Sequence, residues 1–269
     1  MLERRVTDMV EYSVIIPAHN EEAWLPACLD SIERAAECAR IKPEIVVVLN
    51  RCEDRTEDLA RPRAVLVREE APNLARIRNA GARASTGRTL ITLDADSRMA
   101  PNLFIEVGRA LESGRYVGGG VPVRAERVSP GIVATGILLL IPFLVRGLSG
   151  GLFWCGRPDF EAIGGFDERW LSGEDFDFAV RLKKHGRATA RKFATLWRTH
   201  ILTSCRKFDR WGDWFVWKIL LRDPRGFVAT YRGRNPALAN RFWYAAERFR
   251  DSKAGADDQA VRNNSRIRS

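Results

Sequence analysis

The sequence predicts an α/β fold in which a mostly parallel, Rossmann-like sheet carries helices on both faces. Strand and helix signals alternate through the first half of the 269 residues. One of the strands, residues 44–49, is apolar on both faces, as buried parallel strands are. Alternation of this kind requires crossovers that place helices over the sheet. With 45% apolar residues, the chain also has enough hydrophobic material for a core.

Four strand segments follow one another in this half, and the first three each precede a helix. β-branched runs indicate the strands, and apolar residues that repeat every three or four positions indicate the helices. The expected strands are residues 12–16, 44–49, 64–67 and 89–93, and the expected helices are residues 22–39, 56–60 and 73–85. Ligands of such sheets bind beyond the carboxyl ends of the strands, so we expect the functional residues in the loops there.

After residue 113 the pattern is less regular, although a helix is expected over residues 174–185. The run Ile132–Val145 is apolar on every side of a helix and contains Pro142. It is shorter than the roughly 20 residues that span a membrane. We expect it to be a buried core helix, the alternative being a helix at a bilayer surface. The first 20 residues lack the apolar segment of a signal peptide, which predicts a cytoplasmic protein.

The formal charge of +10 is concentrated at the C-terminal end. Residues 1–185 carry 25 Lys and Arg against 27 Asp and Glu, whereas residues 186–269 carry 19 against 7. This asymmetry predicts a nearly neutral globular domain followed by a segment that meets an anionic surface. The expected parts are a domain over residues 1–205 with halves at about 10–113 and 114–205, a basic aromatic helical segment at 206–251, and a disordered tail at 252–269.

The basic segment interleaves cationic and aromatic side chains, beginning with Arg206 and Lys207 and continuing through Trp211, Trp214 and Trp217. Tryptophan beside arginine favours the interface of a membrane that bears anionic lipid, which predicts peripheral association with the inner face of the membrane. Packing of the segment on the domain and stacking of single-stranded nucleic acid are the alternatives. Nothing in the chain resembles a nucleic-acid module, so no nucleic acid is expected as a partner.

Asp94 and Asp96 are separated by one alanine at the end of the fourth expected strand. Their charges repel unless a cation lies near, and Mg²⁺ or Mn²⁺ binds one or two carboxylates together with phosphate oxygens. The alternative is that these aspartates form a turn or cap ahead of a helix near Pro101. The five cysteines show neither CxxC spacing nor a histidine at zinc spacing, so neither zinc nor structural disulfides are indicated.

Six short segments in a fixed order extend this pattern along the chain. They are VIIPAHNEE at 14–22, IVVVLN at 45–50, ARIRNAG at 75–81, LDAD at 93–96, GGFDE at 164–168 and GEDFDF at 173–178. The series resembles the family 2 glycosyltransferases of the GT-A fold. The resemblance implies transfer of a sugar from a nucleotide-diphosphate sugar, with a UDP-sugar favoured, to an acceptor hydroxyl on a lipid or a cell-envelope glycan.

The resemblance also implies residues that bind the donor. Pro17, Ala18 and Glu21, with Glu22 as the alternative to Glu21, would hold the nucleotide base in the loop after the first strand. Asn50 stands where the family usually has an aspartate that hydrogen-bonds uracil. An amide both donates and accepts, so guanine and thymine stay open as well.

Two further residues complete the implied donor site. Arg78 would approach the phosphates, because the planar guanidinium suits phosphate oxygens. Asp94 would lie near the ribose or the sugar. Both are expected at the edge of the sheet where the strands end.

The implied chemistry rests on Asp175, which would take the proton of the acceptor hydroxyl, while Glu174 contacts the acceptor or tunes this base. A single base suits an inverting, one-step displacement. Asp96 and His200 would hold the Mn²⁺ or Mg²⁺ that bridges the diphosphate. A non-catalytic nucleotide-sugar-binding protein or a membrane-surface scaffold is the alternative, and the presence of both Asp96 and Asp175 favours the enzyme.

Overall fold

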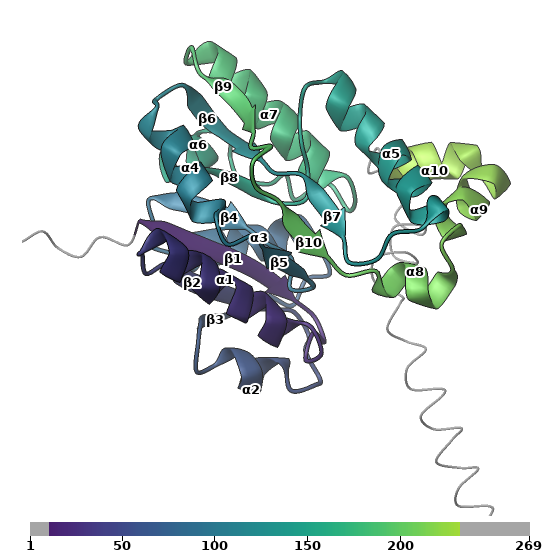
Figure 1. The fold of residues 1–269 in the computed structure, drawn as a ribbon, viewed down its shortest axis with the longest axis horizontal. Helices are drawn as coiled ribbons and strands as arrows, with labels where there is room; N and C mark the ends of the chain where they lie inside the picture. The colour runs from purple at the N-terminus through teal and green to yellow at the C-terminus, as the bar shows by residue number, and fades with distance from the viewer. Residues whose placement is uncertain (1–10, 232–269) are drawn as a thin grey trace, which may run out of the picture.

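A seven-stranded sheet forms the centre of the protein, whose computed structural model describes residues 11–231 (Figure 1). The strand order is β3-β2-β1-β4-β8-β6-β9. The first four strands along the chain are parallel to one another: β1 (Tyr12–Ala18), β2 (Glu44–Leu49), β3 (Val65–Arg68) and β4 (Thr89–Thr92). The others are β6 (Tyr116–Gly120), β8 (Phe153–Gly156) and β9 (Lys192–Thr195), of which β8 runs antiparallel to β4 and β6. The expected mostly parallel α/β sheet is therefore confirmed.

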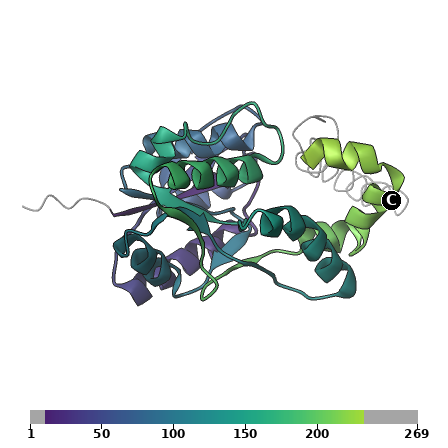
Figure 2. The same cartoon turned by 90° about the horizontal axis from the view of Figure 1, so that it is seen from above.

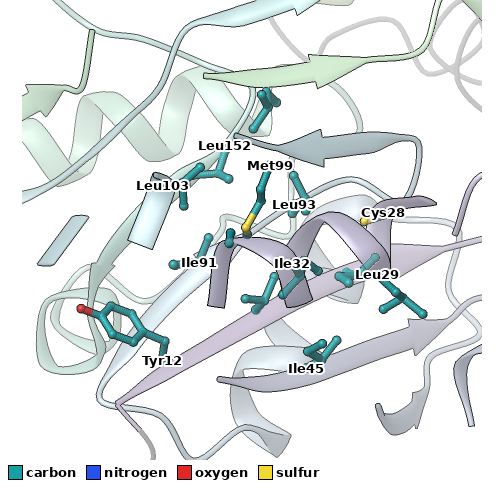
Figure 3. Packing of buried hydrophobic residues seen from close by; sticks show 14 of the residues in the cluster. Tyr12, Cys28, Leu29, Ile32, Ile45, Ile91, Leu93, Met99, Leu103 and Leu152 are labelled. Atoms are coloured by element: carbon teal, nitrogen blue, oxygen red, sulfur yellow. The ribbon is translucent and has the colours of Figure 1, made fainter. Parts of the chain in front are cut away.

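Helices cover both faces of this sheet (Figure 2). On one face lie α1 (Leu25–Ala39) and α4 (Leu103–Glu112), with the short α2 (Thr56–Ala60) beside α1. On the other face lie α3 (Leu74–Ala84), α6 (Arg157–Ala162) and α7 (Glu174–Ala188). The apolar residues of α1 recur every three or four positions, so its buried stripe packs on β1 and β2 around Leu29 and Ile32 (Figure 3). Each face thus has its own hydrophobic cluster.

A second, three-stranded sheet lies beside the first and has the order β5-β10-β7. Its strands are β5 (Ser97–Met99), β7 (Val123–Ala125) and β10 (Ile201–Thr203). Strand β10 is antiparallel to β5, with Thr203 opposite Ser97. This register brings the chain that leaves β10 alongside the aspartates that precede β5.

Helix α5 (Pro130–Val145) departs from the expectation for the apolar run. Its N-terminus is capped by Ser129, but only Gly131, Ile132 and Thr135 of the helix are buried. Ile137 is 59% exposed and Ile141 is 49% exposed. The prediction of a buried core helix is therefore wrong, because no described element covers most of this surface. Among residues 11–231, no helix has the length and apolar character needed to cross a membrane.

Three short helices follow β10: α8 (Arg206–Trp211), α9 (Phe215–Arg222) and α10 (Pro224–Tyr231). They gather with α5 at one end of the molecule, away from the helices of the main sheet (Figures 1 and 2). The expected C-terminal helical segment is confirmed as far as Tyr231. The remainder of that segment and the tail at 252–269 lie outside the described residues. All five cysteines are free thiols, as expected.

Candidate active site

The candidate site lies at the carboxyl edge of the main sheet, where the loops after β1, β2 and β4 meet. These three strands are parallel and adjacent, so their ends lie together. The N–H of Asn50 donates to the carbonyl of Ala18 at 2.9 Å, which holds the first two loops side by side. The N–H of Glu21 donates to Oγ1 of Thr56 at 2.7 Å and fixes the first loop to the start of α2.

Asn50 is buried at the base of this edge. Its Nδ2 donates to the carbonyl oxygens of Ala71, at 3.0 Å, and of Glu69. These contacts tie the loop after β3 to β2 and explain the amide, since a carboxylate would face two carbonyl oxygens. The donors of Asn50 are thus used within the chain, and its Oδ1 is the atom with which it can recognise a base, although Arg51 Nε also lies 3.3 Å from it.

Arg78 on α3 is the centre of an acidic cluster and is only 3% exposed. Its Nη2 lies 2.9 Å from Asp94, and its Nη1 lies 2.5 Å from Asp175 and 3.2 Å from Glu174. The guanidinium also lies over the ring of Phe166, 5.2 Å from its centroid. In the structure its terminal nitrogens contact carboxylates, so Arg78 joins the loop after β4 to α7, and its approach to phosphates stays a prediction.

Glu174 and Asp175 begin α7, and Gly173 makes this start possible. Gly173 has φ 79°, in the left-handed region that a residue with a side chain adopts at a cost. Burial raises the pKa of Glu174 to about 7, assisted by the charge of Asp175. Burial also raises the pKa of Asp175, against the lowering effect of Arg78. Carboxyl groups whose pKa is raised toward neutrality are suited to proton transfer at physiological pH.

Asn79 positions the other side of this cluster. Its Nδ2 donates to the carbonyl of Phe166 at 2.8 Å, and its Oδ1 accepts from the Phe166 N–H at 2.9 Å. Gly165, at φ 64°, has no room for a Cβ, which would lie 2.6 Å from Asn79 Oδ1. The GGFDE segment, residues 164–168, therefore packs closely against α3 and fixes the loop before α7 to that helix.

Asp96 lies on the far side of Asp94 from this cluster. Its Oδ2 accepts a hydrogen bond from Ser204 Oγ at 3.0 Å and lies 3.1 Å from Arg206 Nε. The terminal nitrogens of Arg206 also form a bidentate ion pair with the buried carboxylate of Glu21, with both N–O distances 2.7 Å. Arg206 therefore bridges the loop after β1 and the loop after β4.

Lys207, the next residue, is half-buried within electrostatic reach of Glu21, Asp94 and Asp96. Burial lowers its pKa to about 8. The boundary that the sequence suggested at residue 205 thus divides the site, because Arg206 and Lys207 belong to it. Sequence reasoning placed both in a membrane-facing segment, and only the β5–β10 pairing shows where they lie.

His200 does not join Asp96. The β5–β10 register places His200 opposite Ala100, where its carbonyl accepts the Ala100 N–H at 3.1 Å. Four ladder positions separate it from the Ser204–Asp96 contact, which at the usual strand rise is roughly 13 Å. Burial and the charge of Arg124 lower the pKa of His200. The structure shows no contact between Asp96 and His200, and their pairing on one metal ion stays a prediction.

Most of the other expected residues do come together at this edge. Pro17, Ala18, Glu21 and Asn50 line the ends of β1 and β2, and Asp94 separates them from the pair Glu174 and Asp175. In this arrangement a loop system able to hold a nucleotide stands beside a carboxyl pair with raised pKa values.

The family comparison agrees with this arrangement. Residues 13–146, about half of the chain, match the model of glycosyl transferase family 2. An uncharacterized glycosyltransferase of Haemophilus influenzae is 26% identical over 187 residues, which are 63% of this chain and 61% of that protein. The undecaprenyl-phosphate 4-deoxy-4-formamido-L-arabinose transferase of Aeromonas hydrophila is 30% identical over 115 residues, 40% of this chain and 34% of that protein. The chain therefore spans less than two thirds of the length of either relative.

Solved structures share the fold. TarS 1–349 of S. aureus in complex with UDP-GlcNAc has a TM-score of 0.56 at 15% identity, covering 88% of this chain and 76% of that one. Glucosyl-3-phosphoglycerate synthase of Mycobacterium tuberculosis, in complex with Mn²⁺, UDP and phosphoglyceric acid, has a TM-score of 0.55 at 15% identity, covering 82% and 78%. The fold is the GT-A fold, and with the matched domain and the order of its motifs it shows that the chain belongs to glycosyltransferase family 2.

Proposed function

We propose that the chain is an inverting glycosyltransferase that moves a sugar from a nucleotide-diphosphate sugar, a UDP-sugar above all, to an acceptor hydroxyl. The observation that carries this proposal is the set of ion pairs at Arg78, which joins Asp94 of the loop after β4 to Glu174 and Asp175. A donor at the strand ends would lie beside the carboxyl pair, as displacement at the anomeric carbon requires.

Asp175 is the proposed base. The acceptor oxygen forms a bond to the anomeric carbon while its proton passes to a carboxylate oxygen of Asp175. The bond between that carbon and the donor's phosphate oxygen breaks, and its electron pair leaves with the nucleoside diphosphate. Asp175 is 32% exposed, so an acceptor can reach it, whereas Glu174 is 9% exposed and is better placed to set the charge around it.

Asn50 offers a hydrogen-bond acceptor for the base, which uracil can use. Its Oδ1 can accept the N3–H of uracil, while its Nδ2 is held by the backbone. Thymine and guanine also carry an N–H at the equivalent edge, so nucleotide choice needs a direct measurement. UDP-GlcNAc is bound in the TarS structure and UDP in the mycobacterial structure named above.

A divalent metal is the remaining part of the expected site. Mn²⁺ is present in the mycobacterial structure. In this chain Asp96 is paired with Arg206 and Ser204, His200 is remote, and the described residues contain no group of three His, Cys, Asp or Glu side chains that could hold a metal ion. These side chains do not fit the expected metal set, and the transfer step above does not require one.

A membrane-bound acceptor is favoured by α5. This helix exposes Ile137, Ile141 and Leu144 at the end of the molecule that also carries α8–α10, where Trp211 and Trp214 are exposed. Apolar residues beside tryptophan and arginine suit the surface of an anionic bilayer. We propose peripheral attachment at the inner face and an acceptor that is lipid-linked or part of a cell-envelope glycan. A membrane-surface scaffold without catalysis is the alternative.

The test compares wild type with Asp175→Asn, measuring UDP release from UDP-sugars and UDP affinity by calorimetry. We expect turnover to fall by about 10²–10⁴-fold, the usual contribution of a general base, with UDP affinity within about threefold of wild type. Asp177→Asn is the matched control, because Asp177 lies on the same helix turn but pairs with Arg181 at 2.6 Å. Unchanged turnover in Asp175→Asn, or equal loss in both variants, would contradict the assignment. A scaffold protein would bind UDP without releasing it from any UDP-sugar.

A further inference from the structure

We propose that Arg206 and Lys207 form the cationic side of the donor's diphosphate site, at the position where a divalent metal was expected. The inference rests on the proposed function, since it names the groups that neutralise the departing nucleoside diphosphate. It follows from the mismatch between the expected metal ligands and the side chains that surround Asp96.

Three carboxylates lie within reach of the same two cations where β1 and β4 end. Glu21 comes from the loop after β1, and Asp94 and Asp96 come from the loop after β4. Neighbouring negative charges repel one another, so a compensating cation stabilises them. The chain supplies two, because Arg206 contacts Glu21 and Asp96 and Lys207 lies within electrostatic reach of all three carboxylates.

The position of Arg206 competes directly with a metal at Asp96. Its Nε lies 3.1 Å from Oδ2, the same oxygen that accepts from Ser204 Oγ. Its terminal nitrogens hold both oxygens of Glu21, which is 10% exposed. Bidentate arginine–carboxylate pairs of this kind are among the stronger ion pairs, so this one holds the guanidinium beside Asp96.

The same anchoring suits the binding of a diphosphate. Glu21 and Asp96 fix the orientation of the guanidinium before any ligand arrives. A cation held in advance needs no reorganisation when negative charge grows on the leaving phosphate, which is the condition for effective electrostatic stabilisation. Lys207 adds a compact ammonium at the same place, a geometry that proteins use for phosphate oxygens. Together the two residues supply the charge that a metal ion would otherwise provide.

Calorimetric titration with UDP, in EDTA and in excess Mn²⁺, tests this role. Wild type should bind UDP in EDTA, with an affinity within about threefold of that in Mn²⁺. Arg206→Ala should weaken binding in EDTA at least about tenfold, which corresponds to about 1.4 kcal/mol. Arg206→Lys keeps the positive charge but not the planar guanidinium, so its UDP affinity in EDTA should lie between those of wild type and Arg206→Ala. Arg210→Ala is the matched control, because it removes an exposed arginine from the same helix.

Two results would overturn the inference in different ways. If wild type binds UDP only with Mn²⁺, and Arg206→Ala binds equally well or better, Arg206 merely occupies the place of a metal, and the proposed function stands without this inference. If wild type binds no nucleotide in either buffer, the donor site itself is refuted. Should Arg206→Ala show a disrupted thermal transition, Lys207→Met carries the same test, since it removes the second positive charge near these carboxylates.

Discussion

Replacing Arg78 with glutamine should destabilise the protein strongly and in a pH-dependent manner. Arg78 is 3% exposed and is the shared partner of Asp94, Glu174 and Asp175. Removing one partner of a buried ion pair costs about 3–5 kcal/mol. Asp94 and Asp175 are 43% and 32% exposed, so water screens part of their charge, and the lower value is the better expectation. For a domain of this size, 3 kcal/mol corresponds to a decrease in Tm of roughly 6–12 °C.

The sign of the pH dependence follows from the carboxyl pair. Glu174 and Asp175 already have pKa values above those of the unfolded chain, and Arg78 holds both values down. Without Arg78 their pKa values rise further, so their ionisation opposes folding. The cost is largest at pH 8 and shrinks as pH falls through the raised folded values toward the ordinary carboxyl range.

Thermal melts at pH 5 and pH 8 measure this effect, with Arg83→Gln as the control. Arg83 lies on the same helix but is 63% exposed, and its partner Glu168 is 3.8 Å away. A Tm deficit for Arg78→Gln that is the same at both pH values, or no larger than that of Arg83→Gln, would refute the view that Arg78 compensates buried carboxylates.

Three further outcomes are expected. Asn50→Asp should lower stability by about 1–3 kcal/mol near neutral pH, because a carboxylate would face two backbone carbonyl oxygens; a melt that shows no loss would mean that the loop after β3 can move away. The rate of UDP release should fall as the pH is lowered toward 5, because burial raises the pKa of the base Asp175 and protonation then removes it at a higher pH than for an exposed aspartate; a rate that stays constant down to pH 5 would exclude this base. The double variant Ile137→Asp with Ile141→Asp should lose binding to anionic vesicles in a sedimentation assay, whereas Val65→Asp, equally apolar and 46% exposed on an edge strand, should not. Equal binding by both variants would place membrane contact elsewhere.

The first half of the fold was predictable because its signals are local. Strands β1 to β4 and helices α1 and α3 follow from β-branched runs and helical periodicity, and the structure places each within a few residues of expectation. The placement of Asn50 and Asp94 at one edge was also predictable, since parallel strands bring their ends together, whereas Asp175 is linked to that edge through Arg78. The glycines before α7 marked its start in the sequence.

The parts that could not be predicted depend on register or on partners. Nothing in the residues near His200 reveals that the β5–β10 ladder sets it opposite Ala100 rather than Asp96. The composition of α5 shows that it is apolar, but not whether another element covers it. The carboxylate partners of Arg78 could not be predicted either, because sequence does not show which acidic groups reach a given guanidinium.

The contact between Arg206 and Glu21 joins residues 185 positions apart. During synthesis the loops that carry Glu21 and Asp96 leave the ribosome long before α8 does. The nascent sheet therefore holds its acidic loops without their counter-charges until the last strand of the second sheet has paired. A fragment that ends where the family match ends, at residue 146, would lack both cations. On this view the ability to bind a donor appears only when the whole domain has emerged.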